Sequence, residues 1–118
     1  MAEYRKQHPF EKRLQEANRV LDKYQDRIPV LVERAYNEKD LPQIDKKKFL
    51  VPKDITCGQF SYVIRKRLQL TEEKALFMFV GSNNIMPPVS LSMGEIYRHH
   101  HDDDHFLTIL YNSESVFG

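Results

Sequence analysis

The segment RHHHDDDH, residues 98–105, is the densest set of potential metal ligands in the sequence. It contains His99, His100, His101 and His105 together with three aspartates, which supply enough nitrogen and oxygen donors for a zinc or nickel ion. Consecutive residues rarely converge on one ion, however, and no cysteine or distant pair of ligands supports them. Histidines are also favourable near the negative end of a helix. We therefore predict a solvated loop after a helix and no native metal site.

Cysteine chemistry is the second possibility. Cys57, the only cysteine, lies in the first turn of a predicted helix, where a thiolate would be stabilised. No partnered His–Asn arrangement accompanies it, so a small, partly buried side chain is the favoured interpretation. The sequence also lacks GxSxG, HExxH and a phosphate-binding glycine loop. We expect neither an enzyme active site nor a cofactor. A single cysteine excludes an intrachain disulfide and indicates a reducing compartment.

Charge is distributed unevenly, although the net charge is only +1. Residues 1–70 carry 16 Lys and Arg against 10 Asp and Glu, whereas residues 71–118 carry 2 against 7. A basic N-terminal half could meet acidic peptides, anionic headgroups or nucleic acid, or could be an ordinary solvated surface. The basic segment IRKRLQL has no stacking aromatics among its cations, so an exposed helix face is favoured over an RNA site. We expect no nucleic-acid partner.

The length of 118 residues suits one domain with a single hydrophobic core. No apolar run approaches the roughly 20 residues that cross a bilayer. The charged N-terminus MAEYRKQHPFEKR lacks the apolar segment of a secretory signal. These features predict a soluble globular protein of the cytoplasm.

The elements that must position these residues follow from apolar spacing. A helix is predicted from Pro9 to residue 24, because apolar residues recur there every three or four positions. Capping boxes that begin at Thr56 and Ser92 predict two further helices. Strands are predicted at residues 27–34, 46–52, 75–80 and 106–111. This order predicts an α+β fold with one mixed sheet packed on the capped helix, as in a ubiquitin-like β-grasp with an extra helical segment in front.

The segment DKKKFLVP raises the question of an open sheet edge. Pro52 cannot donate to a sheet ladder, so we expect this strand to be an edge strand or to end there. Three lysines beside an edge can guard against aggregation. Alternatively, the edge accepts a peptide strand, with Phe49 and Val51 facing one way and Lys48 and Leu50 the other. The pattern alone leaves both possibilities open.

The sequence ends on NSESVFG, an aromatic residue followed by Gly118. Glycine usually lies within a chain, where a turn requires it. The ending is therefore either an accident of how the chain was cut or a sign that the terminal carboxylate is used.

Seven segments together resemble a known family: HPFEKR, YQDRIPVLVE, IDKKKFLVP, GQFSYVIRKRLQL, NNIMPP, MGEIY and the terminal SVFG. In this order, and over nearly the whole chain, they are similar to the ubiquitin-like autophagy modifiers, which include microtubule-associated light chain three and the GABA-receptor-associated protein. The resemblance implies a β-grasp with a four-stranded mixed sheet and two extra N-terminal helices. The expected organisation is one domain, 1–118, with a helical extension at 1–26, a ubiquitin-like core at 27–111 and a flexible conjugation tail at 112–118.

The resemblance also implies a life cycle centred on Gly118. In that family a cysteine protease exposes the glycine, an activating enzyme adenylates it, and a conjugating enzyme carries it as a thioester. The glycine is then joined by an amide to phosphatidylethanolamine. The protein would be cytoplasmic, and on the autophagosome membrane when lipidated. The alternative is a non-conjugated trafficking or cytoskeletal adaptor that uses the same peptide groove.

The family binds aromatic-x-x-aliphatic peptides of cargo receptors by strand addition. By matching position, the resemblance implies a first pocket, called pocket one below, lined by Glu16, Val20, Pro29, Leu31, Lys48, Leu50 and Phe106. It implies a second, called pocket two, lined by Phe49, Val51, Pro52, Ile55, Phe60, Val63 and Arg67. Arg27 and Lys46 would meet acidic residues of the peptide.

The sequence departs from the family pattern in a few places. Gln25 stands where a proline is usual, the loop 36–43 is divergent, and the GSNN turn is longer than usual. His105 and Thr108 replace commoner aromatic residues near the last strand. None of these departures removes a pocket residue, although His105 beside Phe106 would alter which peptides fit.

Overall fold

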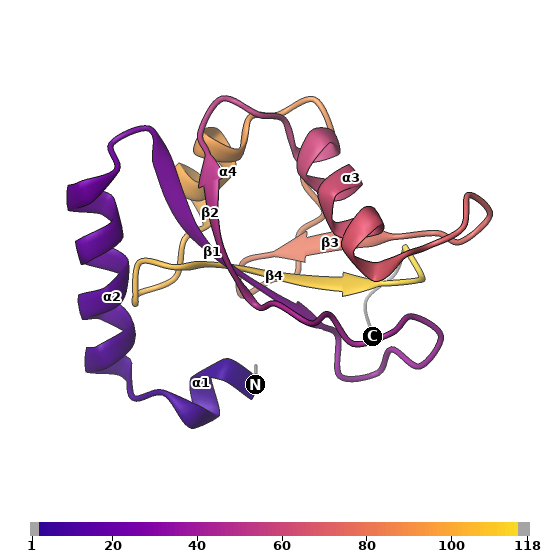
Figure 1. Ribbon diagram of the computed structural model, residues 1–118, viewed down its shortest axis with the longest axis horizontal. Helices are drawn as coiled ribbons and strands as arrows, with labels where there is room; N and C mark the ends of the chain where they lie inside the picture. The colour runs from indigo at the N-terminus through magenta and orange to yellow at the C-terminus, as the bar shows by residue number, and fades with distance from the viewer. Residues whose placement is uncertain (1–2, 116–118) are drawn as a thin grey trace.

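The computed structural model describes residues 3–115, which form one sheet with helices on both of its faces (Figure 1). The N-terminal half contains α1 (Glu3–Gln7), α2 (Phe10–Lys23), β1 (Arg27–Arg34), β2 (Lys48–Pro52) and α3 (Cys57–Leu68). The C-terminal half contains β3 (Phe77–Val80), α4 (Met93–His100) and β4 (Leu107–Asn112). Within residues 3–115, no helix combines the length and the apolar character that a membrane span requires.

The four strands lie in the order β2-β1-β4-β3. β1 pairs antiparallel with β2 and parallel with β4, and β3 pairs antiparallel with β4. The predicted four-stranded mixed sheet with two extra N-terminal helices is therefore confirmed. β2 and β3 form the two edges, and β2 is the strand whose edge position the sequence suggested.

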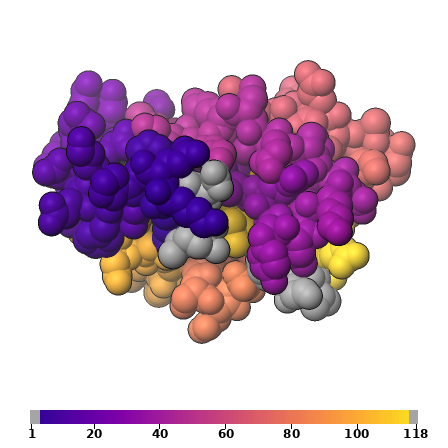
Figure 2. Space-filling view, turned by 90° about the horizontal axis from the view of Figure 1, so that it is seen from below, coloured from indigo at the N-terminus to yellow at the C-terminus, as the bar shows by residue number. Residues whose placement is uncertain are grey.

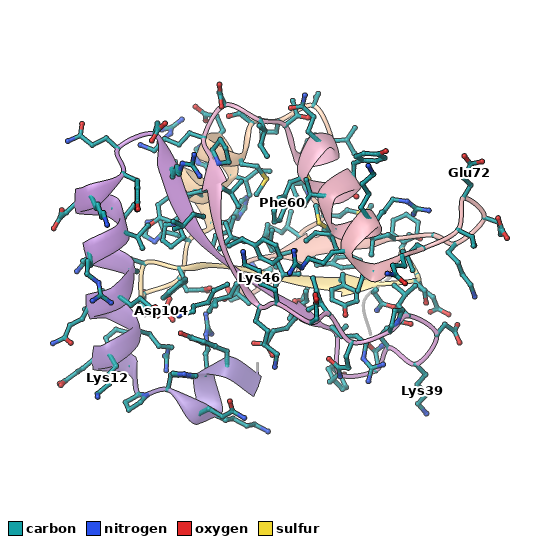
Figure 3. The ribbon with its side chains drawn as sticks, viewed as in Figure 1. Lys12, Lys39, Lys46, Phe60, Glu72 and Asp104 are labelled. Carbon is teal, nitrogen blue, oxygen red and sulfur yellow. The ribbon has the colours of Figure 1, made fainter. Side chains whose placement is uncertain are left out.

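The main core lies between the sheet and the helices α3 and α4. Ile28, Val30 and Val32 of β1 are fully buried there, together with Phe60 of α3. Phe60 points from α3 toward the strands (Figure 3). Burial of these apolar side chains supplies the main favourable free energy of folding.

The opposite face of the sheet carries α1 and α2. A second, smaller cluster there contains Tyr4, Ala17, Leu31 and Phe106. Seen from below, α1 and α2 cover one end of this face, and the segment between β1 and β2 covers the other (Figure 2). β1 consequently has six consecutive buried residues, because both of its faces are covered.

The two predicted helix caps had different outcomes. At α3 the capping box is complete, because Thr56 Oγ1 accepts the Gln59 N–H at 3.1 Å and Gln59 Oε1 accepts the Thr56 N–H at 2.8 Å. At α4 only the first of the two predicted capping-box hydrogen bonds forms. Ser92 Oγ accepts the Glu95 N–H, but the Glu95 carboxylate bonds Arg98 at 2.7 Å instead of returning to the cap.

Candidate functional site

β2 is an edge strand, and within residues 3–115 no other strand pairs with its outer side. Val32 of β1 donates its N–H to the Lys47 carbonyl at 2.8 Å, which makes these two residues a hydrogen-bonded pair. Because antiparallel ladders alternate, the backbone groups of Phe49 face β1, whereas those of Lys48 and Leu50 face outward. Lys48 and Leu50 therefore offer N–H and C=O groups to an incoming peptide.

Two prolines fit this alternation. Pro29 lies opposite Leu50 and Pro52 lies opposite Arg27, and both pairs are of the non-hydrogen-bonded kind. Neither missing N–H therefore removes a bond between β1 and β2. Pro52 does remove a donor from the outer side of the strand. An added peptide would thus find a complete set of backbone partners at Lys48 and Leu50, and only a carbonyl at Pro52.

Pocket one lies on the face of the sheet that carries α1 and α2. Its seven expected residues come from α2, both strands and the position before β4: Glu16, Val20, Pro29, Leu31, Lys48, Leu50 and Phe106. Leu31 and Phe106 are buried in the second cluster and form the floor. Leu50 is 39% exposed and forms part of the rim. Strand pairing and the packing of α2 on β1 bring residues that lie far apart in the chain to this one place.

An ion pair bridges pocket one. Lys48 Nζ lies 2.5 Å from Glu16 Oε2 and so joins β2 to α2. Burial alone would raise the pKa of Glu16, but hydrogen bonds from Lys48 and Tyr4 outweigh it and lower that pKa. The side chain of Lys48 is 48% exposed. An acidic or aromatic group that enters from solvent would therefore meet Lys48 first.

A basic cavity of about 430 Å³ continues from this ion pair along α2. It is lined by Tyr4, His8, Lys12, Arg13, Gln15, Glu16, Arg19 and Lys48. Lysine and arginine outnumber the one carboxylate, which suits an acidic ligand. Sequence reasoning missed Lys12 and Arg19. Their spacing around Glu16 was a usable signal, because positions four and three residues apart share one face of a helix.

Most residues expected for pocket two lie on the opposite face, between β2 and α3, although alternation along β2 gives Pro52 the same side as Lys48 and Leu50. Its expected residues are Phe49, Val51, Pro52, Ile55, Phe60, Val63 and Arg67. The Phe49 ring meets the Phe60 ring edge-on at 5.7 Å between centroids and is only 9% exposed. Lys46 Nζ lies 5.0 Å and Arg67 Cζ 5.9 Å from the Phe49 ring centroid. Phe49 therefore lies beside two cations on the α3 side of β2, where pocket two is expected.

The two residues expected to meet acidic groups do not lie together. Arg27 begins β1 opposite Pro52, whereas Lys46 precedes β2 at the other end of the strand pair. Lys46 lies near the middle of the molecule, close to where the strands cross in this view (Figure 3). Each would contact a different end of an added strand.

Comparison with known proteins decides the family. The family model described as "Autophagy protein Atg8 ubiquitin like" matches residues 12–118. The chain belongs to the Atg8 family. It is 52% identical to Autophagy-related protein 8 of Pichia angusta over 117 residues, which is 99% of this chain and 91% of that protein. It is also 52% identical to Autophagy-related protein 8d of Arabidopsis thaliana, over 100% of this chain and 96% of that protein.

A solved structure agrees with this assignment. The crystal structure of Trypanosoma brucei ATG8 matches with a TM-score of 0.88 at 42% sequence identity, and the match covers 100% of this chain and 99% of that one. The resemblance to the ubiquitin-like autophagy modifiers is therefore confirmed, and with it the ubiquitin-like fold.

In this Atg8-family chain, two of the three aspartates of RHHHDDDH, Asp102 and Asp104, fasten the N-terminal helices to the core. Asp104 is 1% exposed, and its Oδ2 lies 2.8 Å from Arg13 Nε of α2. Asp102 Oδ2 lies 2.6 Å from an Arg5 guanidinium nitrogen of α1. Asp104 also accepts the Phe106 N–H at 3.0 Å and so holds the floor of pocket one. Asp104 lies between α2 and the chain that enters β4 (Figure 3).

Two histidines of the same segment contact each other edge-on, His101 and His105, and each also has a partner elsewhere. His105 Nδ1 lies 2.7 Å from Asn18 Oδ1 of α2, and His101 stacks on Tyr97 with 5.1 Å between ring centroids. Across residues 3–115, no group of three or more His, Cys, Asp or Glu side chains is arranged to hold a metal ion. The described geometry thus gives this segment a structural part, in the attachment of α2.

Two other candidates for chemistry have different surroundings. Cys57 is 4% exposed in the main core, and burial raises the pKa of its thiol, which disfavours the nucleophilic thiolate. Gly118 lies outside the described residues. Before it, β4 continues to Asn112, one residue into the expected tail, and the Ser113 N–H donates to Glu38 Oε1 at 2.6 Å.

Proposed function

We propose that this chain is a ubiquitin-like modifier conjugated through Gly118 to phosphatidylethanolamine on autophagosomal membranes, where it recruits cargo receptors and autophagy machinery. Membership of the Atg8 family supports this proposal. The chain would be a substrate of a processing cysteine protease, an activating enzyme and a conjugating enzyme, and not itself an enzyme. It would be cytoplasmic before conjugation and on the autophagosome membrane afterwards.

The observation that supports recruitment is that β2 is an edge strand with a buried apolar cluster on each of its faces, where the two pockets are expected. Successive side chains of an added peptide strand point to opposite faces. Two anchors that fill both pockets must therefore be separated by an odd number of positions. Anchors at i and i+3 meet this condition and span about 10 Å, whereas anchors at i and i+2 fall on one face. An aromatic-x-x-aliphatic peptide with acidic residues beside it therefore suits the pockets and their basic border.

Conjugation is tested by reconstitution with the activating and conjugating enzymes, ATP and phosphatidylethanolamine liposomes. The expected result is a lipidated product that depends on ATP and disappears with Gly118→Ala. Absence of a product, or an unchanged product from Gly118→Ala, would contradict conjugation. Peptide binding without a lipid product would favour the non-conjugated adaptor instead.

The groove is tested by titration with an acidic-flanked Trp-x-x-Leu peptide. Leu50→Ala is expected to weaken binding about tenfold, because a rim anchor of this kind contributes roughly 1–2 kcal/mol. Lys48→Glu is expected to weaken it further by reversing the charge at the mouth of pocket one. Lys39→Glu, the same charge change at an exposed position far from β2, is the matched control (Figure 3). Peptides with Trp-x-Leu spacing should bind at least tenfold more weakly, and equal binding would contradict strand addition.

A further inference from the structure

Tyr4 connects α1 to pocket one, although it was not among the residues expected to line that pocket. Its side chain is buried, at 6% exposure, in the cluster that contains Leu31 and Phe106. The Tyr4 ring meets the Phe106 ring at 6.2 Å between centroids, with an interplanar angle of 60°. Because Leu31 and Phe106 form the floor of pocket one, Tyr4 supports this floor from the side of α1.

The hydroxyl of Tyr4 also reaches the ion pair that bridges the pocket. It donates to Glu16 Oε1 at 2.9 Å, while Lys48 Nζ lies 2.5 Å from Glu16 Oε2. One carboxylate thus receives a donor on each oxygen, which fixes both its position and its orientation. Lys48 Nζ lies in addition 5.9 Å from the Tyr4 ring centroid, within the range of a cation–π contact.

The protonation states suit this arrangement. Burial, together with the hydrogen bond to Glu16 and the charge of that carboxylate, raises the pKa of Tyr4 to about 12. The phenol is therefore a hydrogen-bond donor at every pH near neutrality. The Tyr4 and Lys48 bonds in turn keep Glu16 ionised, in spite of its partial burial.

Other contacts hold α1 without the Tyr4 hydroxyl. The Tyr4 N–H donates to Glu33 Oε1 at 3.1 Å, and Arg5 pairs with Asp102 at 2.6 Å. Arg5 also donates to Thr108 Oγ1 at 3.3 Å. Removal of the hydroxyl alone therefore changes the contact with Glu16 and leaves the attachment of the helix in place.

We propose that Tyr4 is a positioning residue for pocket one: its hydroxyl holds the Glu16 carboxylate where that group sets the Lys48 ammonium at the mouth of the pocket. α1 then takes part in peptide binding without touching the peptide. This inference rests on the groove assigned under the proposed function. By linkage, docking of α1 and occupation of pocket one favour each other.

The test is Tyr4→Phe, which keeps the ring and removes the hydroxyl. Binding of the acidic-flanked Trp-x-x-Leu peptide is expected to weaken about 3- to 10-fold, mainly through faster dissociation. In a Glu16→Ala background, the same change is expected to have no further effect, because its partner is gone. Tyr111→Phe is the matched control. It removes a hydroxyl that donates to the Pro42 carbonyl at 2.6 Å, away from the groove, and should keep wild-type affinity.

A second measurement separates positioning from simple support of the fold. In Tyr4→Phe, the carboxyl shift of Glu16 followed against pH by NMR should show a pKa moved upward, toward the ordinary value. The inference would be overturned if Tyr4→Phe left the peptide affinity unchanged. It would also be overturned if Tyr4→Phe weakened peptide binding equally in the wild-type and Glu16→Ala backgrounds. A wild-type protein that does not bind the peptide would instead overturn the groove itself, so the two failures are distinguishable.

Discussion

Glu38 offers the sharpest quantitative prediction, because its buried carboxylate joins two distant parts of the chain. The residue is 3% exposed. Its Oε2 accepts the N–H groups of Asp40 and Leu41, each at 2.7 Å, and its Oε1 accepts the Ser113 N–H at 2.6 Å. The divergent loop after β1 is thereby tied to the chain just beyond β4. Burial would raise the pKa of Glu38, but these backbone hydrogen bonds outweigh it and lower that pKa.

Glu38→Gln preserves the shape of the side chain and removes its charge. A glutamine has one acceptor oxygen, so at least one of the buried N–H groups must face the amide nitrogen, which is itself a donor. A buried donor without a partner costs about 1–3 kcal/mol, and bonds to charged acceptors are stronger than bonds to neutral ones. We expect a loss of about 2–3 kcal/mol in the free energy of unfolding.

The assay is thermal unfolding at several pH values. For a chain of this length the unfolding entropy is about 250 cal/mol/K, so the expected loss lowers Tm by about 8–12 °C at pH 7. Because the folded-state pKa of Glu38 is lowered, its contribution is complete above the unfolded value of roughly 4.3 and is lost as pH falls through the folded value. The difference in Tm between the wild-type protein and Glu38→Gln should therefore become smaller at acidic pH.

Glu72→Gln makes the same chemical change at an exposed position and should leave Tm within about 1 °C, as surface substitutions usually do (Figure 3). Hydrogen exchange gives an independent measurement, since the Ser113 amide should lose protection in Glu38→Gln. A Tm gap below about 2 °C at pH 7, or one that does not depend on pH, would refute the reasoning about Glu38.

Three further predictions concern other residues. Asp104→Asn weakens the buried pair with Arg13 and should cost about 3 kcal/mol, with faster hydrogen exchange in α1 and α2 than in β1. Unchanged exchange in those helices would contradict the attachment role. Gln69, the C-cap of α3, has a left-handed backbone with a φ of 56°, which glycine adopts more easily. Gln69→Gly should therefore raise the free energy of unfolding, measured in urea, by up to about 1 kcal/mol. A lower free energy of unfolding would contradict the idea that the backbone of Gln69 is strained. Cys57 should react slowly with a thiol reagent in the native protein and quickly in guanidinium, because burial raises the pKa of its thiol. Fast labelling of the native protein would contradict this prediction.

The sequence predicted the elements well where the signal was local. Pro52 marked the end of the edge strand, and the Thr56 capping box marked the first turn of α3, because both effects act within a few residues. The second capping box failed for an equally local reason. Glu95 had a competing partner in Arg98, three residues later on the same face of α4.

The features that sequence reasoning missed are the long-range ones. The aspartates of RHHHDDDH suggested either a metal site or a solvated loop, whereas Asp104 pairs with Arg13, a residue 91 positions away. Tyr4 carried no local sign that its hydroxyl would reach Glu16. Alternation along β2 predicted that Phe49 and Val51 share one face, but not that the Phe49 ring lies beside Lys46 and Arg67.

Because of these long-range contacts, the two pockets should differ in their stability against local opening. Of the residues expected for pocket two, Phe49, Val51 and Phe60 belong to the main core, so their arrangement should persist as long as the domain is folded. Pocket one depends on the N-terminal helices: Glu16 comes from α2, and Tyr4 supports its floor from α1. Those helices are attached by the buried cluster of Tyr4 and Ala17 and by the ion pairs of Arg5 and Arg13 with Asp102 and Asp104. Local opening of the extension would therefore separate Glu16 and Tyr4 from Lys48 and leave the contacts between β2 and α3 in place, because stability in a folded domain is not uniform.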